Sequence, residues 1–232
     1  MNDYSIISIS DRAIDNKDRT RSILHEMNEF TKFEPCNGKT SNAFMELKKL
    51  GIALSSYAPD DGRIDPFSPG EAGVCVSIVR LMISAIENNV ESLLVLEDDA
   101  IIDNAFLDVA RQALAECPSD WDFLSLVPRQ ELNVETHDSL FGAKLIHRCL
   151  TQPSYFQAVI LSLAGMRKYL SYLQLHGMEY NIDSVMYRMS HKGLLNGFIL
   201  RNDAPRIVRH DPAIYPTEID SNNLRNVDNL IL

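Results

Sequence analysis

The sequence has no apolar run long enough to cross a membrane. Its longest apolar-rich stretches, such as residues 158–165, fall far short of the roughly 18 residues that a membrane-spanning helix needs. The opening residues, Met1 to Tyr4, form neither the basic nor the apolar part of a signal peptide. We therefore expect a soluble, cytoplasmic protein.

Glycine, proline and cysteine are also scarce. Ten glycines and ten prolines in 232 residues are too few for a low-complexity or fibrous chain. The four cysteines lie more than thirty residues apart, which matches neither a zinc-binding pattern nor a disulfide framework. At about 150 residues per domain the length predicts one large domain. We place this domain at residues 1–211 and a polar tail at 212–232.

Basic residues are sparse in the middle of the chain. No lysine occurs between residues 50 and 142, and the segment 87–138 has 13 acidic residues against 2 basic ones. Because the whole chain has a formal net charge of −10, we do not expect a nucleic-acid partner. A concentrated acidic block of this kind indicates a cation site, a solvated face or both.

Strand and helix patterns alternate along the chain and predict an α/β fold with a mixed, mostly parallel central sheet flanked by helices. The clearest helix spans residues 71–88, where apolar residues repeat at helical spacing from Val74 to Ala85. A second stripe on it, through Ser77 and Arg80, indicates either the wall of a cleft or an ordinary flank of a core helix. The other expected strands are 5–9, 92–96, 122–127, 143–146, 157–161, 197–200 and 206–208. The other expected helices are 17–30, one after Asp103 whose apolar face repeats from Phe106 to Cys117, 164–175 and 182–191, and 34–69 should hold loops with at most one short helix.

The strand at 92–96 ends directly in three acidic residues, Glu97, Asp98 and Asp99. In an open α/β sheet, ligands bind at the carboxyl ends of the strands. Neighbouring carboxylates raise one another's pKa unless a cation compensates them, and Mg²⁺ or Mn²⁺ suits oxygen ligands. Strand alternation turns Glu97 and Asp99 to one side, which gives an acid-x-acid pattern. The alternative is that these carboxylates cap the next helix, as we expect of Asp103.

The acidic triplet belongs to a wider pattern of short segments. The most specific are Leu96-Glu97-Asp98-Asp99-Ala100 and the run from Gly70 to Leu81, which begins Gly-Glu-Ala-Gly. Further matches are Ile9-Ser10-Asp11-Arg12 with Arg19, Trp121-Asp122, the run 158–162, and Asn181-Ile182-Asp183. Together these segments, which touch most of residues 5–190, resemble glycosyltransferase family 25.

The resemblance implies a single Rossmann-like, A-type glycosyltransferase domain that binds a nucleotide sugar. Enzymes of this family build lipopolysaccharide, lipooligosaccharide and related glycans. The resemblance therefore implies transfer of a sugar, from a UDP-sugar such as UDP-galactose, to a hydroxyl of a glycan acceptor. It also implies metal dependence and inversion at the anomeric carbon. A lipid-linked acceptor would bring the enzyme to the inner face of the membrane.

The resemblance also assigns roles to individual residues. Glu97 and Asp99 would bind Mn²⁺ or Mg²⁺, with His210 as a further ligand, and Asp183 would be the general base. Asp183 stands where a helix should start, so a helix cap is the alternative. The donor would contact Ser8, Arg12, Arg19, Glu71, Ser77, Glu97 and Asp98.

Two departures from the family pattern keep other functions open. Ile78 stands where the family usually has a histidine, and residues 34–69 match poorly, so the pocket for the donor base is undefined. One alternative is a relative that binds a nucleotide sugar or glycan without transferring it, although the retained acid pair argues against it. The other is a phosphoryl-transfer receiver or phosphatase, although a receiver's acidic pair should follow the first strand.

Overall fold

The computed structural model describes residues 3–7, 30–33, 35–38, 41–54, 68–97, 100–127, 145–149, 156–179, 181–201 and 203–209. The expected helix at 17–30, apart from its last residue, and the tail at 212–232 lie outside these ranges.

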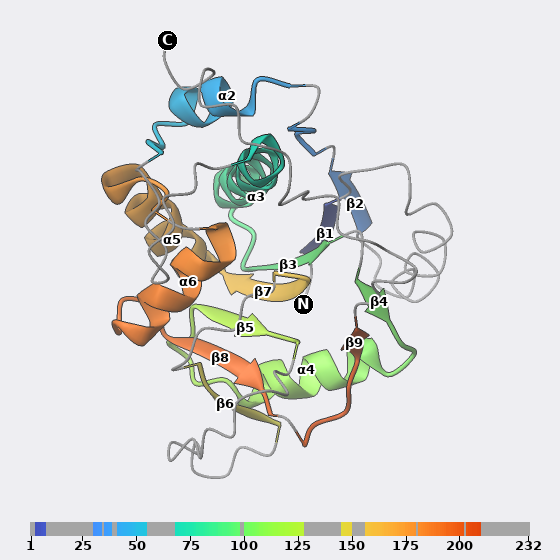
Figure 1. The fold of residues 1–232 in the computed structure, drawn as a ribbon. Helices are drawn as coiled ribbons and strands as arrows, with labels where there is room; N and C mark the ends of the chain where they lie inside the picture. Colours follow the sequence, from blue (N-terminus) through green and yellow to red (C-terminus); the bar gives the residue numbers. More distant parts are fainter. Residues whose placement is uncertain are drawn as a thin grey trace.

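A mixed sheet forms the centre of the described structure (Figure 1). Its strands are β1 (Asp3–Ile7), β2 (Phe30–Phe33), β3 (Ser92–Glu97), β5 (Phe123–Ser125), β6 (Ile146–Arg148), β7 (Ala158–Ser162) and β8 (Gly197–Leu200). They lie in the order β2-β1-β3-β7-β5-β8-β6, and only β7 and β6 of these described strands run against their neighbours. The predicted mixed, mostly parallel sheet is confirmed.

Helices cover both faces of this sheet (Figure 1). One face carries α2 (Ala43–Lys49), α3 (Pro69–Glu87), α5 (Leu163–His176) and α6 (Ile182–His191), and the other carries α4 (Phe106–Glu116). Strand β3 serves both cores, because successive side chains of a strand point to opposite faces. Leu93 and Val95 pack with α3, and Leu94 and Leu96 pack with α4, which explains the continuous apolar run.

Helix α3 is the central helix of its layer. It begins with a capping box, in which Glu71 N–H donates to Ser68 Oγ at 3.2 Å and Ser68 N–H donates to Glu71 Oε2 at 2.6 Å. By length and composition alone, α3 is long and apolar enough to cross a membrane. Glu71 and Arg80 interrupt its apolar residues, so the sequence shows no unbroken apolar run there. Here most of its apolar side chains are buried against the sheet, α2 and α5, so α3 is a core helix.

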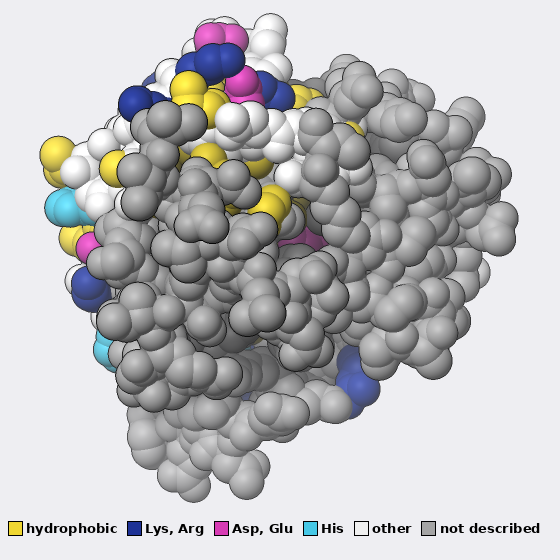
Figure 2. All heavy atoms as spheres, turned by 45° about the horizontal axis from the view of Figure 1, so that its top comes forward, with side chains coloured by type: hydrophobic (Ala, Val, Ile, Leu, Met, Phe, Trp, Pro, Cys, Tyr) yellow, Lys and Arg dark blue, Asp and Glu magenta, His cyan; other side chains and the backbone are white. Residues whose placement is uncertain are grey.

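The second stripe of α3 packs against the segment that follows β2. Ser77 Oγ accepts a hydrogen bond from Cys36 N–H and donates one to Gly73 O, both at 2.8 Å. A Cβ atom on Gly73 would lie 2.7 Å from Cys36 O, so only glycine permits this approach. Arg80 pairs with Glu46 of α2. Figure 2 shows basic and acidic side chains together at the end of the molecule where α2 lies. Gly73 and Ser77 are therefore the flank of a core helix, whereas Arg80 lines a pocket of about 430 Å³ together with Cys36 and Glu46.

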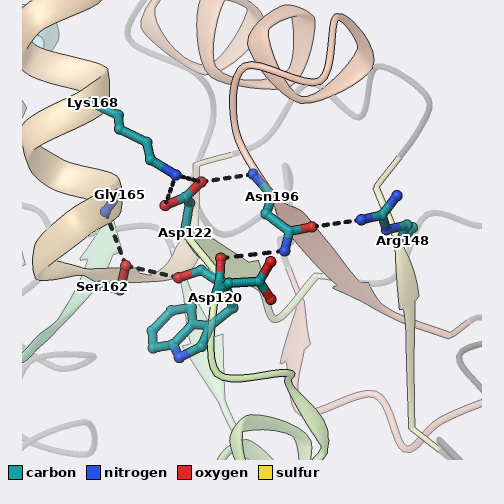
Figure 3. Close-up of polar contacts among 8 residues, drawn as sticks. Asp120, Asp122, Arg148, Ser162, Gly165, Lys168 and Asn196 are labelled. Carbon is teal, nitrogen blue, oxygen red and sulfur yellow. Dashed lines mark hydrogen bonds and ion pairs between the residues drawn. The ribbon is translucent and has the colours of Figure 1, made fainter.

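Asp122 joins three elements at the edge of the sheet where β5 begins (Figure 3). Its side chain is 1% exposed and accepts hydrogen bonds from Lys168 Nζ of α5, at 2.7 and 2.9 Å, and from Asn196 N–H before β8, at 2.8 Å. The start of α5 also packs closely against the backbone of Asp122, because a Cβ atom on Gly165 would lie 2.1 Å from Asp122 O. The Trp121-Asp122 motif therefore fixes α5 and β8 to β5.

A small antiparallel sheet lies beside the main one (Figure 1). It pairs β4 (Ile101–Ile102) with β9 (Val208–Arg209), with Ile101 opposite Arg209 and Ile102 opposite Val208. Asp103 N–H continues the ladder to Ile207 O at 3.2 Å. The end of the described chain is thereby tied to the segment that follows the acidic triplet.

Candidate active site

Three of the sequence-predicted acidic residues lie at one edge of the sheet. Glu97 is the last residue of β3, at its carboxyl end. Helices α3 and α6 precede the parallel strands β3 and β8, so both helices begin at this carboxyl edge. Glu71 is in the first turn of α3 and Asp183 is in the first turn of α6. The fold therefore brings together side chains that are far apart in the sequence.

Electrostatic interactions agree with this placement. Burial is the main cause that raises the pKa of Asp183, and the negative charge of Glu71 adds to the rise. Asp183 and Glu97 both help to raise the pKa of Tyr187, after the larger effects of its burial and of Cys149. The three carboxylates thus share one electrostatic environment, the kind of setting in which acid and base catalysts are found.

Asp183 is half-buried at the second helical position of α6. Burial is the main cause that raises the pKa of its carboxyl above the usual value, and hydrogen bonding to Ser184 opposes the rise. The carboxylate accepts from Ser184 N–H at 2.7 Å. The N-cap position itself belongs to Asn181, so Asp183 satisfies a first-turn amide without being the cap residue. A raised carboxyl pKa suits a general base that works near neutral pH.

Two buried tyrosines interact electrostatically with Asp183, and sequence reasoning missed both. Tyr187 follows Asp183 by one helical turn and packs edge-on against Phe123, with ring centroids 5.6 Å apart. Burial raises the pKa of Tyr187 and of Tyr169 well above that of an exposed tyrosine, so both hydroxyls keep their protons. The Tyr169 hydroxyl donates to the carbonyl of Ile182, directly before Asp183. The four-residue spacing of Tyr187 from Asp183 was the one available sequence signal.

Helix α4 does not begin directly after the acidic triplet, as the capping alternative requires. Strand β4 follows the triplet, and α4 begins only at Phe106, with Ala105 as its N-cap. The prediction that Asp103 caps α4 is wrong, because Asp103 stands two residues before the N-cap and its carboxylate accepts from Ala105 N–H, at 2.8 Å, and not from an amide of the first helical turn. Glu97 is half-buried, and its amide donates to Gln157 O at 3.0 Å. Glu97 therefore lies at the end of β3 and is not part of the N-terminus of α4.

The predicted metal ligands fall mostly beyond the described part of the chain. Asp98, Asp99 and His210 lie outside it, and the described residues alone contain no group of three side chains that could hold a metal ion. The flanks of the predicted ligands are described, however. Arg209, which precedes His210, pairs with Ile101, which follows Asp99 by two residues.

The predicted donor contacts divide into three groups. Ser8, Arg12 and Arg19 lie outside the described residues. Glu71 lies at the carboxyl edge, where one carboxylate oxygen is held by the capping box. Ser77 is fully buried with its hydroxyl bonded in both directions, so the structure gives it a packing role in place of the expected donor contact.

Ile78 occupies the position at which the family usually has a histidine. Its side chain is fully buried in the core between α3 and the sheet. A histidine there would need a hydrogen-bond partner in apolar surroundings. In this chain the position therefore contributes to packing.

The raised pKa of Asp183 predicts a pH-dependent stability. Because folding disfavours the ionised carboxylate, the stabilising contribution is present below the unfolded pKa of about 3.9 and is lost as pH rises through the folded value. Asp183→Asn should therefore be more stable than the wild type at pH 7, with a smaller difference at pH 4. Urea unfolding at both pH values measures this. A variant that is less stable at both would contradict it.

A comparison with protein families gives a match. A family model described as "Glycosyltransferase family 25 (LPS biosynthesis protein)" matches residues 1–186. No curated protein sequence matches the chain.

Several solved structures are similar to the chain. A glycosyltransferase involved in glycosylation of the major capsid of PBCV-1 is 11% identical over 90% of this chain and 83% of that one, with a TM-score of 0.44. Residues 1–349 of S. aureus TarS, in complex with UDP-GlcNAc, are 13% identical over 94% of this chain and 62% of that one, with a TM-score of 0.42. The galactosyltransferase LgtC, with donor and acceptor sugar analogs, is 9% identical over 81% and 69%, with a TM-score of 0.38.

The family match extends from β1 into α6 and so includes Glu71, Glu97 and Asp183. The open mixed sheet with helices on both faces agrees with the A-type fold that the resemblance implies. The chain belongs to glycosyltransferase family 25.

Proposed function

We propose that this glycosyltransferase moves a sugar from a UDP-sugar to a hydroxyl of a glycan acceptor, with inversion and with the help of a divalent cation. The observation that carries the proposal is the meeting of Glu97, Glu71 and Asp183 at the carboxyl edge of the sheet. Helices α3 and α6 both begin there, and helix N-termini favour anions such as a diphosphate. A lipid-linked glycan is the acceptor that the family description suggests.

The pairing of β4 with β9 supports the cation site. Along the sequence, His210 is one residue and Asp99 is two residues from the paired Arg209 and Ile101. Glu97, Asp99 and His210 would hold the ion, since two carboxylates and an imidazole suit Mn²⁺ well. When bound, the cation would supply positive charge beside the departing nucleoside diphosphate.

Asp183 would perform the proton transfer. Its carboxylate takes the proton of the acceptor hydroxyl, and the hydroxyl oxygen bonds to the anomeric carbon of the donor. The bond between that carbon and the phosphate oxygen breaks on the opposite face, which inverts the configuration. Tyr169 holds the backbone next to Asp183 through Ile182, so the base keeps its position. Donor contacts by Ser8, Arg12, Arg19, Glu71 and Asp98 are part of this proposal.

Calorimetric titration with UDP, GDP and CMP, each with and without Mn²⁺, tests the donor and the cation together. We expect UDP to bind with a dissociation constant below about 1 mM in Mn²⁺ and at least about tenfold more weakly without it. Transfer from the matching UDP-sugar should then release UDP. Nucleotide binding without any transfer would favour the non-transferring relative, and equal binding with and without Mn²⁺ would overturn the cation proposal.

A further inference from the structure

An open pocket of about 620 Å³ lies at the amino edge of the sheet, where β5 and β8 begin and β6 ends. Glu97 and Asp183 lie at the opposite, carboxyl edge, so this pocket is separate from the candidate active site. Its volume is within the range of small-molecule sites. The side chains that matter for its chemistry are Asp120, Asp122, Arg148, Lys168, Lys192 and Asn196.

Two of the charges in this pocket neutralise each other. Asp122 and Lys168 form a close ion pair, and Asn196 N–H donates to the same carboxylate (Figure 3). The buried Asp122 therefore forms a fixed part of the pocket floor and offers no free charge to a ligand.

Among the described residues, Arg148 is held in place by an uncharged partner. Its Nη2 donates to Asn196 Oδ1 at 3.1 Å, and Asn196 Nδ2 donates to Asp120 O at 3.2 Å (Figure 3). The amide orients the guanidinium but carries no charge, and a guanidinium has five N–H donors in all. Within the described part of the chain, Arg148 and Lys192 make no ion pair, in a protein whose net charge is −10.

An acceptor for hydroxyl groups lines the same pocket. The carboxylate of Asp120 also lines the pocket, and its side chain makes no hydrogen bond or ion pair with other described residues. At the end of α6, turn hydrogen bonds from Lys192, Gly193 and Leu194 occupy the carbonyls of Arg188, Ser190 and Met189. These hydrogen bonds satisfy carbonyl oxygens that carry partial negative charge at the end of α6, so they repel an anion less strongly.

We propose that this pocket binds a sugar that carries a phosphate group. Arg148 and Lys192 bind the phosphate, since a guanidinium fork matches phosphate geometry and an ammonium adds a point charge. Asp120 accepts a hydrogen bond from a sugar hydroxyl. Inorganic phosphate would make no favourable contact with the Asp120 carboxylate, whereas a sugar phosphate would bind the cations through its phosphate and Asp120 through a hydroxyl. The inference does not depend on the proposed donor site.

Titration of the ¹⁵N-labelled protein with glucose 6-phosphate, without metal or nucleotide, tests the proposal. We expect saturable binding with a dissociation constant below about 1 mM, at least about tenfold tighter than for glucose or inorganic phosphate. The amide signals of residues 192–197 should shift. Arg148→Gln should weaken binding at least about tenfold, and Lys192→Gln about threefold.

Two controls keep the result specific. Arg111→Gln removes a half-exposed cation from α4, and Glu97→Gln changes the opposite edge, so both should bind as the wild type does. Thermal unfolding checks that Arg148→Gln is folded. Absence of saturation up to about 10 mM, or equal affinity in a folded Arg148→Gln, would overturn the site. Equal binding of inorganic phosphate would overturn the assignment of a sugar ligand.

Discussion

Asp183→Asn is expected to lower the rate of sugar transfer by about a thousandfold, within the range that general acid–base catalysis contributes. Asparagine keeps an oxygen that can accept from Ser184 N–H, so the start of α6 should be preserved. The proton acceptor is lost while the nucleotide contacts remain, so nucleotide affinity should stay within about twofold. Steady-state transfer assays and calorimetry measure the two effects separately.

Asp108→Asn is the matched control for this prediction. It removes a carboxylate that is 87% exposed on α4, on the opposite face of the sheet from α3 and α6, and should transfer sugar at the wild-type rate. Because ionised Asp183 opposes folding, the inactive variant should also be the more stable one at pH 7. Transfer by Asp183→Asn within about tenfold of the wild-type rate would remove Asp183 from the role of base.

Asp122→Ala is expected to lower the free energy of unfolding by about 2–4 kcal/mol, because it breaks a buried ion pair and leaves Asn196 N–H without its acceptor. For a chain of this size the loss corresponds to a drop in melting temperature of roughly 5–15 °C. Lys168 is half-exposed and can regain water, which keeps the loss below that of a fully buried pair. Urea unfolding monitored by circular dichroism measures it.

Asp120→Ala is the control for this second variant. Asp120 stands two residues earlier, is exposed, and makes no side-chain bond with the described residues. Its replacement should change the free energy of unfolding by less than about 0.5 kcal/mol. Similar losses in the two variants would show that the junction of β5, α5 and β8 does not depend on the Asp122 carboxylate.

Local patterns predicted the long helices well. Helix α6 has the predicted bounds, 182–191, and α3 differs from the predicted 71–88 by two residues at its start and one at its end. Both carry apolar repeats with clear end signals, such as Ser68 and Pro69 before α3. The core strand β3 was equally legible, because burial on both faces leaves a continuous apolar run.

Elements that depend on distant partners were less predictable. Strand β4 has two residues and exists through its pairing with β9, more than 100 residues later. The edge strand β6 was expected at 143–146 and lies at Ile146–Arg148, where burial decreases along the strand. The contacts among Asp122, Lys168 and Asn196 likewise join three segments that no local pattern relates.

The candidate site shows the same division. The sequence motifs identified Glu97 and Asp183, and topology brings both to the carboxyl edge. The packing role of Ser77 could not be predicted from its position on a helix, because its burial depends on the segment around Cys36. Tyr169 was missed since its partner, the carbonyl of Ile182, belongs to another helix.

The central claim is that the acidic residues after β3 bind the donor nucleotide through a divalent cation. The most direct measurement is calorimetric titration of UDP in Mn²⁺ with the wild type, Asp99→Asn and the control Asp108→Asn. We predict that Asp99→Asn weakens UDP binding at least about tenfold in Mn²⁺ and leaves the metal-free affinity unchanged, while Asp108→Asn matches the wild type. UDP binding that is equally tight in Asp99→Asn and the wild type would contradict the account.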